Sequence, residues 1–226
     1  TGTEIQYLTV TVDYQGGEDE GLRGAGAKLV DASPVFTEVV FRDLRGSYGG
    51  AVHCSGASFP EFDRCRFENK FAAAVGGAVA CVGRPSPEFD RCLFVGNVAA
   101  GSGGAIHAGF ESTPRMAQCT IVENQAPVGS GLSSWDNPGM MLDMVILTGG
   151  QGGAAWSGDY DSAPSIAVSD LYGNEGGDWV GALEPAAGLP GNISAAPQFC
   201  GPANPAEPYS LNASSPCGGP PGLSMG

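Results

Sequence analysis

The pairs Asp63-Arg64 and Asp90-Arg91 lie 27 residues apart and are the best candidates for chemistry in the sequence. If successive 27-residue segments stack on each other, the two aspartates lie about 4.8 Å apart. Carboxylates at that distance can raise the pKa of one partner, as acid–base catalysis needs, or hold a cation. The alternative is a surface ladder in which the arginines offset the like charges. We favour the ladder, because the next segment has Ala117-Gln118 at this place and adds no Lys or His.

The two histidines and an acidic loop are weaker candidates. His53 and His107 are two segments apart, about 10 Å in a stacked repeat, which is too far for one metal ion. Asp159 and Asp161 can form a Ca²⁺ or sugar site, although such loop tips are more often solvated turns. We therefore expect no catalytic residues and no cofactor, with Ca²⁺ at Asp159 and Asp161 as the one metal to consider.

Five of the seven cysteines follow the 27-residue spacing and form two columns, Cys65, Cys92 and Cys119 in one and Cys54 and Cys81 in the other. Metal thiolates and disulfides are the functional alternatives. We favour stacks of small buried side chains, because free cysteine is among the most buried residue types and the sequence lacks the C-x-x-C pair typical of zinc sites. A Cys54–Cys81 disulfide is kept as an alternative, since the Cα–Cα distance between stacked neighbours falls within the range seen in disulfides.

Cys200 and Cys217 lie outside this spacing, in a proline-rich tail. We predict that they form a disulfide, which closes a loop of about 18 residues and stabilises the fold by roughly 3 kcal/mol. A structural disulfide fits a protein outside the cytoplasm. The sequence begins at Thr1 and shows no signal peptide, so we expect a processed or trimmed chain.

Three copies of one unit position these residues, beginning at Gly49, Gly76 and Gly103 and running to Ser130. Each copy starts with GGA, and the first holds two short apolar runs, at 51–54 and 62–67, with turn residues between them. A fixed period of this size is typical of stacked repeats, in which each unit is stabilised by its neighbours. Each unit is therefore predicted to be one coil of short strands.

The pattern GGAV or GGAI, then S-x-P-x-F-x-x-C-x-F and an asparagine, resembles the repeat of bacterial secreted right-handed parallel β-helix proteins, a group that includes polymorphic outer-membrane protein repeats. The tail from Ala196 to Cys217 resembles the "F-C … SPC" end that closes many of these β-helices. The resemblance implies an all-β fold, a single right-handed parallel β-helix. The group mixes adhesins, lyases and structural proteins, so the resemblance implies a fold rather than an activity.

We expect one β-helix domain over residues 1–226, with seven to eight coils and a length of about 35 Å. The segment from Thr3 to Tyr14 alternates polar and apolar residues and is predicted to begin the first coil. Near the corners, Asn69, Asn97 and Asn124 are predicted to form an amide ladder. The expected parts are N-terminal coils at 1–48, regular repeats at 49–130, irregular coils at 131–175 and an irregular, disulfide-closed tail at 176–226.

The net charge of −14 and the pI of about 4.3 argue against a nucleic-acid partner, and no apolar run is long enough to span a membrane. The ends of a solenoid expose strand edges that can pair with another chain. We therefore expect a non-enzymatic secreted or cell-surface structural protein that self-associates through the solenoid ends, as in an extracellular filament. The alternative is a polysaccharide-active enzyme or glycan-binding module that uses the face around Asp63 and Asp90 or the Trp156–Asp161 loop.

Overall fold

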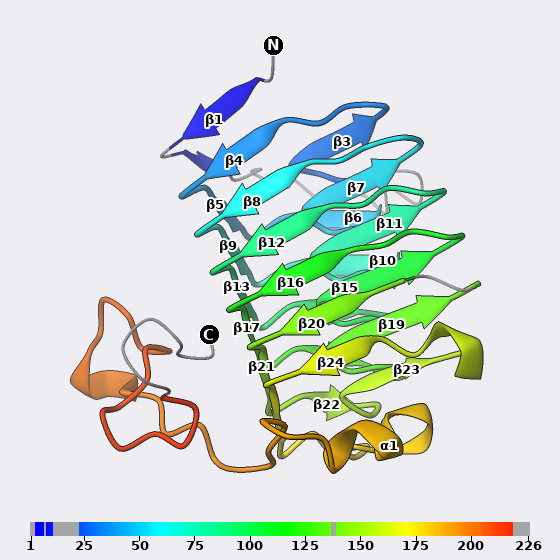
Figure 1. Cartoon of the computed structure of the whole chain (residues 1–226). Coiled ribbons are helices and arrows are strands. Elements are labelled where there is room, and N and C mark those ends of the chain that lie inside the picture. The colour runs from blue at the N-terminus through cyan, green and yellow to red at the C-terminus, as the bar shows by residue number, and fades with distance from the viewer. Residues whose placement is uncertain (1–2, 7, 11–22, 137–138, 219–226) are drawn as a thin grey trace.

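The chain folds into a parallel β-helix in which short strands from successive coils stack into four parallel sheets (Figure 1). The computed structural model describes residues 3–6, 8–10, 23–136 and 139–218. Each strand pairs in register with its counterpart one coil away, so that Phe62 lies between Phe36 and Phe89. The parallel β-helix predicted from the 27-residue period is confirmed.

Sheets A and B contain seven strands each. In order along the stack, sheet A consists of β1 (Glu4–Gln6), β4 (Val35–Thr37), β8 (Glu61–Asp63), β12 (Glu88–Asp90), β16 (Arg115–Ala117), β20 (Met141–Asp143) and β24 (Ser165–Ala167). Sheet B consists of β2 (Thr9–Val10), β5 (Val40–Arg42), β9 (Arg66–Glu68), β13 (Leu93–Val95), β17 (Thr120–Val122), β21 (Ile146–Thr148) and β25 (Asp170–Tyr172).

Sheets C and D have five and six strands. Sheet C consists of β6 (Arg45–Tyr48), β10 (Phe71–Val75), β14 (Val98–Ala99), β18 (Gln125–Ala126) and β22 (Gln151–Gly152). Sheet D consists of β3 (Ala27–Val30), β7 (Val52–Ser55), β11 (Val79–Val82), β15 (Ile106–Gly109), β19 (Leu132–Trp135) and β23 (Trp156–Gly158). The described helices are short: the 3₁₀ turns η1 (Tyr160–Ser162), η2 (Gly181–Leu183) and η3 (Gly201–Ala203), and α1 (Glu184–Ala187).

The stack has about six turns, slightly fewer than the seven to eight predicted. In the described part of the chain, five coils contain all four strands, from β3 to β22. The first coil contributes β1 and β2, and the last contributes β23, β24 and β25. The count is lower than predicted because, among the described residues, the first coil contributes two strands and the last three.

Left-handed residues at the corners divide each coil into more strands than the sequence predicts. The sequence predicts one strand over 62–67, but Arg64 has a φ of 51° and separates β8 from β9. Met144, with a φ of 54°, separates β20 from β21 in the same way. The chain therefore turns from sheet A to sheet B at an equivalent place in each coil. The column of positive-φ residues at this corner is Glu38, Arg64, Arg91, Gln118, Met144 and Val168.

The glycine pairs that begin each repeat form the corner between sheets C and D. The first glycine of each pair is left-handed, with φ of 70° at Gly49, 65° at Gly76 and 66° at Gly103. A Cβ on the second glycine, Gly77, would lie 2.0 Å from the carbonyl oxygen of Gly104. A larger residue therefore cannot occupy this corner without moving the next coil.

Two stacks of phenyl rings fill the interior between sheets A and B. Ring centroids of Phe62 lie 4.8 Å from Phe36 and 4.9 Å from Phe89. The second stack joins Phe41, Phe67 and Phe94 at 5.0 and 4.6 Å. The stacked rings are tilted by 11° or less and are buried, so aromatic packing joins these three successive coils.

The predicted cysteine columns point into this core. Cys54 and Cys81 are register partners on β7 and β11, and both are fully buried. The side chains of the second column, Cys65, Cys92 and Cys119, are at most 2% exposed. Their thiols donate hydrogen bonds to main-chain oxygens of the preceding coil. Cys65, Cys92 and Cys119 bond in this way to Phe36, Phe62 and Phe89, at 3.4, 3.2 and 3.4 Å. The stack of small buried side chains is thus the arrangement observed.

The C-terminal tail lies against sheet B without the predicted disulfide. All seven cysteines are free thiols, which includes Cys200 and Cys217. Cys217 is buried against the sheet and donates from Sγ to Oδ2 of Asp170 at 3.1 Å, whereas Cys200 is half-buried. Burial raises the pKa of the Cys217 thiol to about 12, so it stays protonated as a donor. An apolar cluster that includes Ile146, Phe199 and Leu211 completes the contact.

The C-terminal end of the solenoid is capped. Leu183 of η2 is 1% exposed and joins the hydrophobic core, and Trp179 packs partly buried beside it. Main-chain groups of the last coil also form hydrogen bonds with the segment that follows the sheets. The N–H of Ala155 donates to the carbonyl oxygen of Gly177, and the N–H of Leu171 donates to that of Ile193. Figure 1 shows the segment around α1 beneath the last strands.

At the N-terminal end, the described residues of the first coil leave part of an interior column exposed at Leu8. β1 and β2 form within the predicted segment from Thr3 to Tyr14, of which Tyr7 and residues 11–14 lie outside the described residues. Leu8 continues the inward column of Val39 and Cys65, by the register of the strands that follow. Val39 and Cys65 are fully buried, whereas Leu8 is 48% exposed.

The amide ladder is confirmed for two of its three predicted members. The Nδ2 of Asn97 donates to the Oδ1 of Asn124 at 2.9 Å. The prediction for Asn69 is wrong by one residue, because Asn69 is exposed at a corner with a φ of 57°. Lys70 occupies the ladder position instead, since Phe71 and Val98 are register partners.

Candidate functional site

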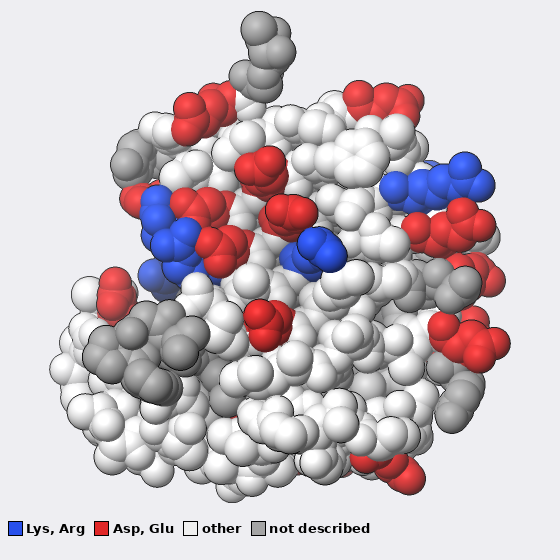
Figure 2. All heavy atoms as spheres, viewed as in Figure 1, with Lys and Arg blue, Asp and Glu red and all other residues white. Residues whose placement is uncertain are grey.

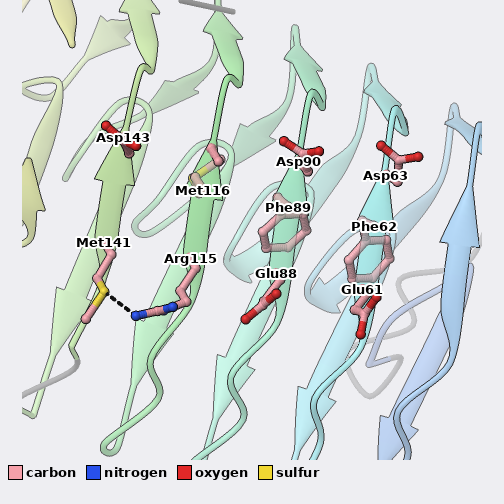
Figure 3. Close-up of a pocket in the computed structure, with 11 residues that line it drawn as sticks. Glu61, Phe62, Asp63, Glu88, Phe89, Asp90, Arg115, Met116, Met141 and Asp143 are labelled. Carbon is pink, nitrogen blue, oxygen red and sulfur yellow. Dashed lines mark hydrogen bonds between the residues drawn. The ribbon is translucent and has the colours of Figure 1, made fainter. Parts of the chain in front are cut away.

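The outer face of sheet A carries the predicted Asp63 and Asp90 beside an open depression of about 600 Å³ (Figure 3). Strand alternation points Phe62 and Phe89 into the core and the residues on either side of each outward. Four neighbouring strands line the depression. Their outward residues, from β8 to β20, are Glu61 and Asp63, Glu88 and Asp90, Arg115 and Ala117, and Met141 and Asp143.

The aspartates stack as the spacing predicts, and arginines join them. Asp63 and Asp90 are register partners. Nη2 of Arg91 lies 3.0 Å from Oδ1 of Asp63 and 2.6 Å from Oδ2 of Asp90. Arg64 adds ion pairs to Asp63 at 2.9 Å and to Glu38 at 3.1 Å. Charges of opposite sign therefore alternate along the corner, which is the ladder that the sequence analysis favours.

This geometry does not provide a free acid–base pair. Both aspartates accept hydrogen bonds or ion pairs from guanidinium groups, so their carboxylate oxygens are already engaged by the arginines. Within the described ranges, no group of three or more His, Cys, Asp or Glu side chains is placed to hold a metal ion. Figure 2 shows acidic and basic side chains intermixed over the upper coils, with the lower coils largely uncharged. The face can bind through hydrogen bonds and charge.

The histidines lie on the outward side of sheet D, separated by Ala80 in the column, as predicted. His53 is 1% exposed, and neither ring nitrogen has a hydrogen-bond partner among the described residues. Burial, with added repulsion from Arg23 and Lys28, lowers the pKa of His53 to about 4. Both rings are therefore neutral near pH 7, because burial lowers the pKa of His107 to about 4 as well.

His107 contacts two hydroxyl groups rather than a carboxylate. Its Nδ1 lies 2.9 Å from Oγ of Ser133 and 3.3 Å from Oγ of Ser102. A hydrolase of the serine type needs a base that contacts the nucleophile through one nitrogen and an orienting acid through the other. Here one nitrogen serves both serines, so the cluster fits structural hydrogen bonding.

Trp156, which precedes the acidic loop, is buried. Trp156 is 4% exposed, and its indole N–H donates to Oγ of Ser134 at 2.7 Å. The buried Trp156 ring is therefore not available to stack on a sugar, and a sugar site in the rest of this loop stays a prediction. Oδ2 of Asp159 accepts from the N–H of Asp136 at 3.3 Å, and Asp161 is exposed on η1. A Ca²⁺ site at the two aspartates stays a prediction.

Sequence reasoning missed a buried charged group at the start of the amide ladder. Lys70 is 1% exposed, and its Nζ donates to the main-chain oxygen of Glu68 at 2.6 Å. Burial lowers the pKa of Lys70 to about 7, although Asp43 and Glu68 counteract the shift. The carboxylate of Glu68 is bound by Arg42 at 2.7 Å and by Arg66 at 2.6 Å. The spacing of 27 residues between Lys70 and Asn97 is the signal that could have revealed it.

A second depression, of about 350 Å³, lies between sheet B and the tail. Arg64, Arg66 and Arg91 line one side, and the tail contributes Glu207 and Tyr209. Each arginine is already paired with a carboxylate, so the depression has little free positive charge for an anion. The sequence could not reveal it, because the path of the tail follows no repeat.

Comparison with known proteins supports a repeat-level similarity. A family model described as the Chlamydia polymorphic membrane protein repeat matches residues 91–109, which run from the Arg91 corner to the end of β15. No curated protein and no solved structure matches the chain. The chain is thus a β-helix repeat protein that resembles this type of repeat. In the part of the chain that the structure describes, the helices are all too short or too polar to cross a membrane.

Proposed function

We propose that this chain is a structural β-helix module of a bacterial surface or secreted protein, with no catalytic activity of its own. The observation that carries the proposal is the position of Arg91, whose guanidinium binds Asp63 and Asp90 together. The best candidate pair for catalysis is thereby engaged in a surface ion-pair ladder that spans two coils. The similarity of residues 91–109 to a repeat named for membrane proteins supports the location.

The fold suits a rigid spacer or display element. Backbone hydrogen bonds run along the stack in all four sheets, and phenyl and thiol columns fill the interior. Such a solenoid offers long lateral faces whose residues can change without loss of the core. The net charge of −14 keeps those faces soluble outside the cell.

Self-association through a solenoid end belongs to this proposal. The C-terminal end is covered by the segment around Leu183, which argues against a contact there. The N-terminal end, where Leu8 is half exposed, is the end at which association is proposed.

Glycan binding is a second candidate. The depression on sheet A combines the carboxylates of Glu61 and Glu88 with Arg115, and these groups can hydrogen-bond sugar hydroxyls. A panel of polysaccharides tests it: binding or cleavage that is lost in a Glu61→Gln, Glu88→Gln variant of unchanged stability would replace the structural proposal with this one.

The location is tested by labelling cells of the source bacterium with antibodies against the purified chain, before and after lysis. Surface exposure predicts labelling of intact cells and loss of the signal after external protease, while a cytoplasmic protein stays unlabelled and intact as the control. A secreted chain appears in the medium. A signal that is seen only after lysis and resists external protease contradicts the proposal.

A further inference from the structure

We infer that two copies of this chain associate head to head, by antiparallel pairing of β1 across a two-fold axis that passes near Ile5. The inference deepens the self-association proposed above and rests on it. It names the contacting strand, its register and the size of the assembly. A cellular location that proves wrong would leave this contact unaffected, so the two can fail separately.

The first observation is the difference between the two ends of the interior columns. Ile5 continues the column of Phe36, and Leu8 continues that of Val39. Ile5 is half-buried and Leu8 is 48% exposed, although the residues below them are at most 4% exposed. At the opposite end Leu183 and Trp179 cover the columns. Among the described residues, the N-terminal end therefore exposes apolar surface at Ile5 and Leu8 that a further layer would bury.

The second observation is the orientation of main-chain groups on β1, the outermost described strand of sheet A. The N–H of Val35 donates to the carbonyl of Thr3 at 2.9 Å. Main-chain groups alternate in direction along a strand, so Ile5 also faces β4, while Glu4 and Gln6 direct their N–H and C=O groups to the outer edge. Two donors and two acceptors are thus aligned for another strand.

A second copy of β1 matches this edge when it runs antiparallel. A two-fold axis near Ile5 places Glu4 of one copy opposite Gln6 of the other, and the four outward-facing pairs of N–H and C=O groups then form four main-chain hydrogen bonds. The side chains agree with this register. Nε2 of Gln6 donates to Oε1 of Glu4 within the strand, and its second N–H can reach Glu4 of the other copy.

The two-fold axis also fixes the size of the assembly. Each chain uses the same patch in such a contact, so the interface closes after two copies. Because the C-terminal end is capped, a second contact that would extend the stack does not form. We therefore expect dimers in place of the filament expected from the sequence.

Cysteine cross-linking tests the register. In a Cys200→Ser background, Ile5→Cys should form a disulfide-linked dimer on mild oxidation, since the Cα atoms of this pair lie about 4.5 Å apart. A mixture of Glu4→Cys and Gln6→Cys chains should cross-link into the mixed dimer. Each of these two variants alone should stay monomeric under denaturing conditions, because its own equivalents lie about 8 Å apart. Cross-linking of Glu4→Cys alone, or of none of the variants, overturns the proposal.

Gln6→Pro supplies an independent test that spares the fold. It removes an N–H that faces the outer edge and is not used to bind β4. The dimer should weaken about tenfold, because two intermolecular hydrogen bonds are lost. Gln6→Thr, which keeps the N–H, is the matched control, and circular dichroism of both variants reports whether the β-helix is intact. A folded Gln6→Pro chain that dimerises as well as the parent rules out this edge as the contact.

Discussion

Lys70 stands beside Asn97 in the next coil, and the Oδ1 of Asn97 accepts the main-chain N–H of Lys70 at 3.1 Å. Lysine thus occupies the position that asparagine holds in the following two coils. The Nδ2 of Asn124 donates to the main-chain oxygen of Val122, two residues earlier, and Nζ of Lys70 donates to that of Glu68 in the same manner. The ammonium group therefore replaces a ladder amide, at the cost of burying a charge.

Lys70→Asn should stabilise the protein by about 2 kcal/mol at pH 7, because a neutral amide restores the ladder and no charge is buried. The pKa of Lys70 is lowered to about 7 in the fold, from 10.5. Between these values the unfolded chain binds more protons, so the free energy of unfolding of the parent should rise as pH rises from 7 to 10. Urea titrations across this range should show that rise in the parent and a smaller one in the variant. Equal slopes would mean that Lys70 is not buried as described.

His53→Ala should make the protein less sensitive to acid. The pKa of His53 is lowered from 6.5 to about 4, so the unfolded chain binds the extra proton as pH falls through this window and stability is lost. That loss should amount to about 3 kcal/mol for this residue. Alanine is the natural residue at this position in the next coil, Ala80, so the replacement should fit. His107→Ala is the matched comparison, since it also removes contacts to Ser133 and Ser102. Identical acid midpoints for parent and His53→Ala would contradict this account.

Arg91→Gln should change stability by less than about 1 kcal/mol, because the ion pairs are exposed and screened. Gln118 holds the same corner in the next coil, so the backbone should accept the change. The difference from the parent should shrink in 1 M salt, as denaturant titrations at two ionic strengths can show. Arg84→Gln, which breaks the exposed pair with Glu111, is the control. A salt-independent loss of more than about 2 kcal/mol in the free energy of unfolding would contradict this, because it would mean that the ladder is a major source of stability.

Cys92→Val should be nearly neutral, within about 1 kcal/mol, because valine fills the same column at Val39 and Val145. Cys92→Asp should cost at least about 3 kcal/mol, since it places a carboxylate in an apolar stack. Thermal melts of the two variants distinguish a packing role from a chemical one. If valine were as damaging as aspartate, the thiol itself would be required.

The repeat made the fold predictable, since one period of 27 residues placed Phe62 on Phe89 and Asp63 on Asp90. The extra corner at Arg64 was not predictable in the same way, because a left-handed arginine has no signature in the sequence. The disulfide between the two tail cysteines was predicted from their position outside the repeat. Cys217 instead donates a hydrogen bond to Asp170, a partner 47 residues away that no spacing indicates. The ladder was misaligned at Asn69 because an asparagine one residue away was preferred to the lysine in register.

The repeat predicted which residues of the candidate site stack on each other, but not the partners that contact them. The partners of Asp63 and Asp90 come from corner residues, and Arg91 had been expected to offset the charges without a defined geometry. The burial of Trp156 and His53 depends on neighbouring coils and the cap, so pattern alone did not reveal it.

The central claim, a structural module that pairs through its N-terminal end, is tested most directly by sedimentation equilibrium of the purified chain over a wide concentration range. The account predicts a monomer of 22.8 kDa in equilibrium with a species of twice that mass, and nothing larger. Added salt should favour the dimer, because each chain carries a net charge of −14. A monomer at every concentration, or a series of species growing without limit, would contradict it.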